Sequence, residues 1–149
     1  MEAVVFCGIQ ATGKSSFYRE RFFHSHIRIN LDMLRTRHRE ALLLGACIES
    51  KQPFVVDNTN ASADERARCI SPAREAGFRV IGFYFSSPLA EALSRNEARA
   101  ENERIPRVGI LGTHKRLQLP RRDEGYDALY YVRLTDGAFV VEEFRDEVR

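Results

Sequence analysis

The segment G-I-Q-A-T-G-K-S at residues 8–15 constrains the fold of this chain more than any other. It follows the apolar run 3–7, which has the length of a buried strand in a parallel sheet, and it precedes a helical pattern over 15–23. The segment fits the pattern G-x-x-x-x-G-K-[ST], in which the glycines let the backbone curl until several N–H groups point toward one anion. The sequence therefore predicts a phosphate-binding loop between a strand and a helix.

Such a loop predicts a site for ATP and Mg²⁺. Lys14 would reach the β- and γ-phosphate oxygens as a catalytic residue, and the Ser15 hydroxyl would bind the metal. Lysine is rare in this chain, where 20 of the 23 basic residues are arginines, so its presence at position 14 favours a need for a compact ammonium. The alternative is a strand-to-helix turn without a ligand. The predicted ATP-binding residues of the loop are Gly8, Gln10, Ala11, Thr12, Gly13, Lys14, Ser15 and Ser16.

Strand-like and helical segments alternate along the chain. Together they predict one α/β domain over 1–149, with a doubly wound parallel sheet, helices on both faces, and ligands beyond the carboxyl ends of the strands. Two prolines bracket segment 106–120, which we expect to be a broken helix, and Asp136-Gly137 between apolar runs predicts a C-terminal hairpin over 129–144. The expected strands are 3–7, 26–29, 54–56, 80–85 and 129–134, and the expected helices are 15–23, 32–50, 63–76 and 89–101.

Composition narrows the class of protein. The chain is 44% hydrophobic and 30% charged, and it contains neither an apolar run of 18 residues nor a signal peptide. We therefore expect a soluble, unexported, cytoplasmic protein without membrane contact. Cys7, Cys47 and Cys69 are odd in number and widely spaced, and the four histidines lack ligand spacing. The cysteines are expected in the core of a protein from a reducing compartment, and no structural metal is expected.

Asp32 and Arg35 follow the second predicted strand, at the sheet edge where phosphates would lie. Their spacing would put both side chains on one helical face, where the carboxylate could accept a proton from an acceptor hydroxyl and the guanidinium could hold an acceptor phosphate. The alternative is purely structural: Asn30 would cap the helix, Asp32 would favour its dipole, and Arg35 would be an exposed ion-pair partner. Spacing alone does not choose between these two interpretations.

Asp57 follows the third predicted strand and is a candidate metal-binding carboxylate of the Walker B type. Asn58 and Thr59 come next and supply hydrogen-bonding side chains at the same sheet edge. A turn leading into the next helix is the alternative, since Asn and Asp are common in turns. Because the segment follows a strand in a chain that already has a phosphate-binding loop, we favour a functional interpretation.

Arg95 and Arg99 are four residues apart in the predicted helix 89–101 and could form an arginine lid over the γ-phosphate. Segment 95–122 carries eight basic residues against three acidic ones, whereas 123–149 carries eight acidic residues against three basic ones. An anionic ligand should therefore meet the earlier segment. The alternative is a solvated helix with ion pairs, because glutamates alternate with the arginines.

These residues resemble the polynucleotide 5′-kinase domain, found alone and as the kinase half of polynucleotide kinase-phosphatase. The resemblance implies a P-loop kinase fold and transfer of the ATP γ-phosphate to the 5′-hydroxyl of DNA or RNA. It covers nearly the whole chain in order, through residues 8–15, 29–35, 57–60, 95–99 and Pro106, and more weakly 124–127.

By this resemblance Asp32 is the general base toward the 5′-hydroxyl and Arg35 contacts the 3′-phosphate of the acceptor. Asn58 and Thr59 line the acceptor site, and the arginines of segment 95–99 are lid residues on ATP.

The loop interior I-Q-A-T departs from the Pro-Gly-Ser type common in the family, and the spacing from the lid to Pro106 is slightly longer. The sequence has no second aspartate-rich motif of the kind that a phosphatase would need, so we expect kinase chemistry only. Two alternatives remain: a P-loop kinase for a small-molecule hydroxyl, such as a sugar, nucleoside or antibiotic, and an ATP-dependent binding or switch module.

Overall fold

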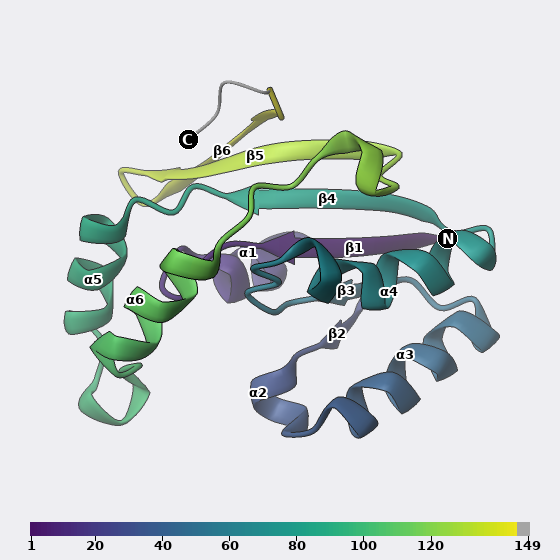
Figure 1. Ribbon diagram of the computed structural model, residues 1–149, viewed down its shortest axis with the longest axis horizontal. Helices are drawn as coiled ribbons and strands as arrows, with labels where there is room; N and C mark the ends of the chain where they lie inside the picture. Colours follow the sequence, from purple (N-terminus) through teal and green to yellow (C-terminus); the bar gives the residue numbers. More distant parts are fainter. Residues whose placement is uncertain (146–149) are drawn as a thin grey trace.

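The structure is a computed structural model that describes residues 1–145, in which a six-stranded sheet has the order β2-β3-β1-β4-β5-β6 (Figure 1). The strands β1 to β5 are parallel, and β6 is antiparallel to β5. Because β1 lies between β3 and β4, its carboxyl end is the topological switch point where ligands of such sheets bind. The strands are β1 (Glu2–Cys7), β2 (Ile27–Ile29), β3 (Phe54–Val56), β4 (Arg79–Phe85), β5 (Ala128–Thr135) and β6 (Ala138–Glu143).

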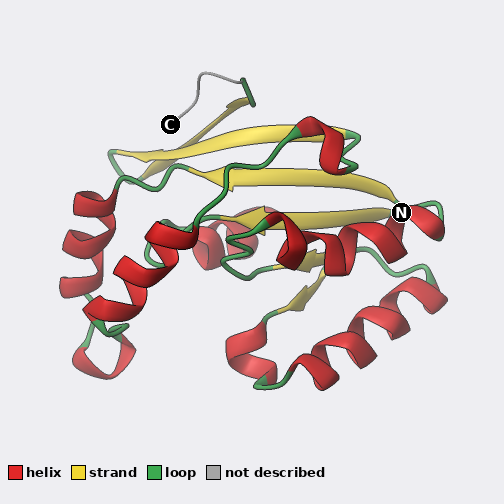
Figure 2. Cartoon of the chain, in the orientation of Figure 1, coloured by secondary structure: helices red, strands yellow, loops and turns green. Residues whose placement is uncertain are grey.

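Helices cover both faces of this sheet, and two more lie beyond the carboxyl ends of its strands. In Figure 2, which has the orientation of Figure 1, α5 and α6 form the group at the left. No helix within residues 1–145 combines the length and the apolar character needed to span a membrane. The helices are α1 (Lys14–Arg21), α2 (Leu31–Leu34), α3 (Arg37–Ser50), α4 (Ala63–Glu75), α5 (Leu89–Glu97) and α6 (Arg107–Arg116), with 3₁₀ helices η1 (Glu101–Glu103) and η2 (Arg122–Glu124).

The central strand β1 is buried on both faces. Ala3 and Val5 pack in the core beneath α3 and α4, whereas Val4 and Phe6 pack on the opposite face, beneath α1. Phe17 of α1 meets Phe6 with ring centroids 5.8 Å apart. Burial on both faces is the reason why the sequence of β1 is a continuous apolar run rather than an alternating one.

The predicted α/β fold is confirmed, and each predicted strand forms with ends that differ by at most one residue. The hairpin forms as well: Asp136 and Gly137 join β5 to β6 with φ angles of 52° and 76°, the positive values that a tight hairpin turn requires. The three cysteines, Cys7, Cys47 and Cys69, are buried free thiols, as the sequence predicted.

Three helix predictions are wrong, and one of them, the helix 89–101 that ends at Glu97, belongs to the candidate site. The predicted helix 32–50 is divided into α2 and α3, because Arg35 adopts a φ of 77° and the Thr36 hydroxyl then caps α3 by accepting the Arg39 N–H at 3.1 Å. Segment 106–120 contains the unbroken helix α6 rather than a broken one. Pro106 precedes the first turn of α6, where a backbone N–H has no helical partner, so the proline starts the helix instead of interrupting it.

Arg66 of α4 is fully buried and joins the helix to three neighbouring segments. Its Nε and Nη2 donate to the two carboxylate oxygens of Glu124 at 2.7 and 3.0 Å. Its Nη1 donates to the carbonyls of Asn60 and Gln118 at 2.8 and 3.0 Å. This bidentate pair therefore fixes the loop after β3 and the segment after α6 against one side of the sheet.

We predict that Arg66→Ala lowers the free energy of unfolding by roughly 3–5 kcal/mol, because it leaves the Glu124 carboxylate and two carbonyls without their donor. Urea unfolding would measure the loss. Arg68→Ala, at an exposed position on the same helix, is the control and should change stability by less than about 0.5 kcal/mol. If the loss of unfolding free energy in Arg66→Ala were as small as that in the control, the Arg66 interactions would not stabilise the fold.

Candidate active site

The predicted phosphate-binding loop joins β1 to α1 at the centre of the carboxyl edge of the sheet. Gly13 caps α1 with a φ of 96°, and a Cβ at this position would lie 2.9 Å from the Phe139 ring. Within residues 1–145 no side chain caps the first N–H groups of α1, so they can bind an anion. The Gly8 N–H donates to the Thr59 carbonyl at 2.9 Å, which fixes the loop to the segment after β3.

The Lys14 ammonium is buried under the loop to which it belongs. Its Nζ donates to the carbonyls of Gly8 and Ile9 at 2.9 and 2.7 Å. Burial lowers the pKa of Lys14 to about 8, and the Asp57 carboxylate opposes this change. Two carbonyls balance only part of the charge, so a phosphate oxygen within reach of Nζ would be a stronger partner than either of them.

Ser15 and Asp57, the two predicted metal-binding residues, are in direct contact. The Ser15 hydroxyl donates to Asp57 Oδ2 at 2.9 Å. Arg28 of β2 contacts both residues, because its Nε donates to Asp57 Oδ2 at 2.8 Å and its Nη2 donates to Ser15 Oγ at 3.0 Å. A hydroxyl and a carboxylate at this spacing suit Mg²⁺, and the Arg28 guanidinium contacts the same two oxygens that the metal would use.

The short helix α2 is tied to the segment after β3 at its first residues. Asn30 caps α2 by accepting the Met33 N–H at 2.9 Å and donates to the Asp57 carbonyl at 2.6 Å. Asn58 Oδ1 accepts the Leu31 N–H at 2.8 Å. Asp32 is the next residue of α2, so two amide side chains determine where its carboxylate lies relative to the loop.

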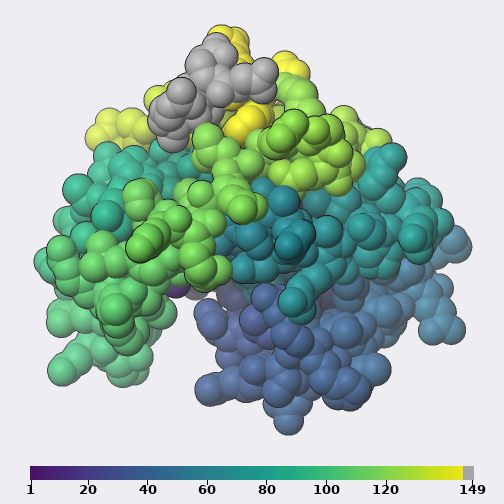
Figure 3. All heavy atoms as spheres, in the orientation of Figure 1, coloured from purple at the N-terminus to yellow at the C-terminus, as the bar shows by residue number. Residues whose placement is uncertain are grey.

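These groups surround one pocket of about 410 Å³. Figure 3 shows the surface hollowed between the lobe that contains α5 and α6, at the left, and the lobe that contains α2 and α3, below the centre. Of the other predicted residues, Gly8 is buried, and Arg35 and Arg95 lie outside the lining. The predicted site residues that line the pocket are Gln10, Ala11, Thr12, Gly13, Lys14, Ser15, Ser16, Asp32, Asp57, Asn58, Thr59 and Arg99.

The predicted helix 89–101 ends early, because α5 stops at Glu97. The Asn96 side chain donates to the Ile105 carbonyl at 2.7 Å and accepts the Ile105 N–H at 2.9 Å. These two bonds clamp the chain between α5 and α6 into a turn that faces the loop. Arg99 lies in this turn and reaches the pocket from there.

Arg95 and Arg99 do not project together from one helix as the spacing predicted. Arg95 stays on α5, where its Nη1 donates to the Ala11 carbonyl at 3.4 Å and its Nη2 contacts the Glu91 carboxylate at 3.2 Å. Arg99, by contrast, lines the pocket directly. Both arginines therefore lie near the phosphate-binding loop, but in different roles: Arg95 is a contact of the loop backbone and Arg99 is part of the pocket wall.

Some residues of the site were not predicted to take part in it. Arg19, Asn30, Glu103 and Ile105 also line the pocket, and Asn30 had been considered only as a helix cap. Gln10 Nε2 donates to Thr113 Oγ1 at 3.0 Å and so connects the loop to α6, a contact that nothing in the sequence indicates.

The chain matches a known protein family over most of its length. The family described as an AAA domain (AAA_33) matches residues 4–120, and the chain belongs to this family. A bifunctional polynucleotide phosphatase/kinase from Schizosaccharomyces pombe is 24% identical over 129 residues. This match covers 84% of the chain and 32% of that relative, so the chain spans about a third of its length.

Similar solved structures have the same fold at low identity. Kti12 from Chaetomium thermophilum, in complex with ADP-AlF3, matches with a TM-score of 0.68 at 16% identity over 90% of each chain. A gluconokinase from Sinorhizobium meliloti matches with a TM-score of 0.60 at 17% identity, covering 87% of this chain and 82% of the other. A sugar kinase from Janibacter sp. matches with a TM-score of 0.63 at 14% identity over 88% and 85%. The fold is therefore that of P-loop kinases and NTPases.

We predict that Arg28→Gln strengthens metal-dependent nucleotide binding. The Arg28 guanidinium and Mg²⁺ repel each other: two unit charges about 4 Å apart repel by roughly 4 kcal/mol at an effective dielectric of about 20, and the double charge of the metal raises this to roughly 8 kcal/mol. Relief of about a sixth of this repulsion, about 1.4 kcal/mol, is tenfold in affinity. The ratio of ADP affinities with and without Mg²⁺, measured calorimetrically, should therefore rise roughly tenfold.

The control is Arg79→Gln, at the opposite end of the sheet, which should leave the ratio unchanged. An unchanged ratio in Arg28→Gln as well would mean that Arg28 and the metal do not compete for the oxygens of Ser15 and Asp57.

Proposed function

We propose that this AAA-domain chain is an ATP-dependent kinase that transfers the γ-phosphate of ATP to the 5′-hydroxyl of a polynucleotide. The observation that carries the proposal is the composition of the pocket of about 410 Å³. One wall is the phosphate-binding loop, another is the carboxylate of Asp32 on α2, and a third is Arg99 from the turn after α5. A phosphate site, a general base and a cation near the γ-phosphate are parts that phosphoryl transfer to a hydroxyl uses.

On the donor side, the N–H groups of the loop and of the first turn of α1 bind the phosphates, and Lys14 exchanges its carbonyl partners for phosphate oxygens. Ser15 and Asp57 would hold Mg²⁺, which would supply positive charge next to the phosphates when bound. Arg99 adds positive charge from the opposite side. Arg95 supports this arrangement by holding the Ala11 carbonyl at the tip of the loop.

On the acceptor side, Asp32 accepts the proton of the attacking hydroxyl as the oxygen–phosphorus bond forms and the bond to ADP breaks. Asp32 is exposed in the structure, so an acceptor can reach it from solvent. Asn58 and Thr59 line the wall next to it. The similarity to a polynucleotide phosphatase/kinase and the excess of basic residues in segment 95–122 support an anionic polymer as the acceptor.

A kinase for a small-molecule hydroxyl is the second candidate. Arg35, the proposed partner of the acceptor 3′-phosphate, is exposed at the end of α2 and outside the lining of the pocket. Without that contact the recognition of a nucleotide would depend on other residues. An acceptor such as gluconate or another sugar would need only the hydroxyl-binding part of the same pocket.

The deciding experiment uses γ-labelled ATP, Mg²⁺, DNA and RNA oligonucleotides with 5′-hydroxyl ends, and a panel of sugars and nucleosides. We expect label on the oligonucleotides, and Asp32→Asn should lower kcat by roughly 10²-fold or more, because the base is lost, while calorimetric ATP affinity stays within about twofold.

Asp64→Asn, an exposed carboxylate at the start of α4, is the matched control and should keep full activity. Label on a sugar but on no oligonucleotide would replace the proposal by the second candidate. An equal loss of ATP affinity and rate in Asp32→Asn would show that this carboxylate serves the nucleotide or the metal instead of the acceptor.

A further inference from the structure

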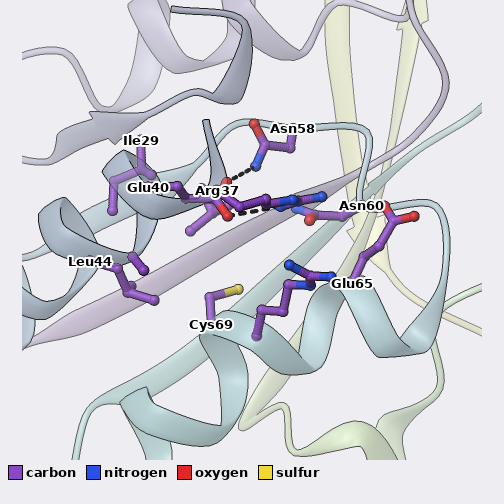
Figure 4. Close-up of a pocket in the computed structure, with 11 residues that line it drawn as sticks. Ile29, Arg37, Glu40, Leu44, Asn58, Asn60, Glu65 and Cys69 are labelled. Atoms are coloured by element: carbon purple, nitrogen blue, oxygen red, sulfur yellow. Dashed lines mark hydrogen bonds and ion pairs between the residues drawn. The ribbon is translucent and has the colours of Figure 1, made fainter. Parts of the chain in front are cut away.

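A second pocket, of about 270 Å³, lies between α3, α4 and the ends of β2 and β3. Figure 4 shows its lining side chains converging from these elements. Its floor is apolar and its rim is polar and charged. The floor is formed by the buried residues Ile29, Leu44, Val56 and Cys69, the exposed Ala41 also lines the pocket, and the rim is formed by Arg37, Glu40, Asn58, Asn60, Glu65 and Arg68.

Asn58 belongs to the walls of both pockets. Its Nδ2 donates to Glu40 Oε2 at 2.8 Å on the side of the second pocket, and the dashed line in Figure 4 marks this bond. Its Oδ1 accepts the Leu31 N–H at 2.8 Å, one residue before Asp32. The second pocket therefore shares the Asn58 side chain with the pocket that Asp32 lines.

The charges at the rim are not all balanced within the protein. Arg37 pairs with Glu40 at 2.8 Å, and Glu65 pairs with Arg116 at 3.0 Å. Arg68 is exposed and makes no ion pair with any other residue in the range 1–145. A ligand in this pocket would therefore meet an apolar floor, hydrogen-bonding groups at its edge, and one cation without a counterion.

We propose that this pocket receives the base of the acceptor nucleotide, whose 5′-hydroxyl then reaches Asp32 and whose phosphate faces Arg68. A nucleobase has apolar faces and a polar edge, which match the floor and the rim. The pocket volume lies just below the range for drug-sized ligands, which suits a part of a nucleotide such as its nucleobase. A sugar carries hydroxyls around its whole ring, and those that face the apolar floor would be left unpaired. This inference rests on the proposed function and adds the recognition of the base to it.

Ala41→Phe tests the proposal, because it adds a ring to the lining of the pocket. Ala46→Phe is the matched control, since Ala46 is exposed on the same helix and lies outside the lining. With adenosine 3′-monophosphate as acceptor, Ala41→Phe should raise KM roughly tenfold or more and leave the KM for ATP within about twofold. Ala46→Phe should leave both constants unchanged. Equal melting temperatures and ATP affinities would show that the variants are folded.

An oligonucleotide with an abasic 5′-terminal residue provides the second arm. With the wild-type enzyme, the KM for this abasic acceptor should be raised by about the factor that Ala41→Phe causes with adenosine 3′-monophosphate. Ala41→Phe should not raise the KM for the abasic acceptor further, because this acceptor has no nucleobase for the pocket to hold. Arg68→Ala should raise the KM for adenosine 3′-monophosphate but leave the KM for adenosine unchanged.

The two levels of the argument fail differently. If Ala41→Phe leaves KM unchanged while oligonucleotides are phosphorylated, the base subsite is wrong and the proposed function stands. If the wild-type enzyme phosphorylates a sugar but neither oligonucleotides nor adenosine 3′-monophosphate, both the proposed function and the proposed nucleobase subsite are wrong.

Discussion

Hydrogen bonds of the four residues 57–60 after β3 connect the phosphate-binding loop, the start of α2 and the central strand β1. The Thr59 carbonyl accepts the Gly8 N–H and thereby anchors the phosphate-binding loop. The Asp57 carbonyl accepts from the Asn30 side chain, which ties the start of α2 to the same segment. Asn60 donates to the Phe6 carbonyl at 2.7 Å, inside the central strand β1. Because these groups are buried, loss of any one would leave an unpaired polar group. The segment therefore fixes the position of the phosphate-binding loop, on the ATP side of the site, relative to α2, on the side of the phosphate acceptor.

The charges of the site are arranged around the ligand that we propose for it. Lys14 is buried, and among residues 1–145 its hydrogen-bond partners are two carbonyls, whereas Arg28 contacts the carboxylate and hydroxyl proposed to hold the metal. Ala11 adopts a φ of 62°, a left-handed conformation that costs an alanine roughly 1–2 kcal/mol. Strain and unbalanced positive charge of this kind are common where a protein is preorganised for an anionic ligand. Phosphates would relieve the imbalance at Lys14, and Mg²⁺ would take over the role of Arg28.

The sheet and the loop could be predicted from sequence because their signals are local: apolar runs of strand length, Asp136-Gly137 between two of them, and a glycine pattern before a helix. The break between α2 and α3 could not, because the left-handed conformation at Arg35 leaves no mark in the hydrophobic pattern. Contacts between segments that are distant in the sequence could not be predicted either. The spacing of Arg28 within β2 gives no indication that it meets Ser15 and Asp57, which lie in other elements.

The shared wall at Asn58 gives the proposed subsite a route to affect the rate as well as affinity. A base seated among Glu40, Arg37 and Asn58 would restrict the amide that also holds the first N–H of α2. Since Asp32 follows directly on that helix, the same contact would restrict the position of the general base. Binding energy from a part of the acceptor that does not react would then be used for orientation, which raises kcat rather than lowering KM alone. A sugar that leaves this pocket empty could bind near Asp32 but would not bring about the same ordering, so discrimination would arise in the transition state.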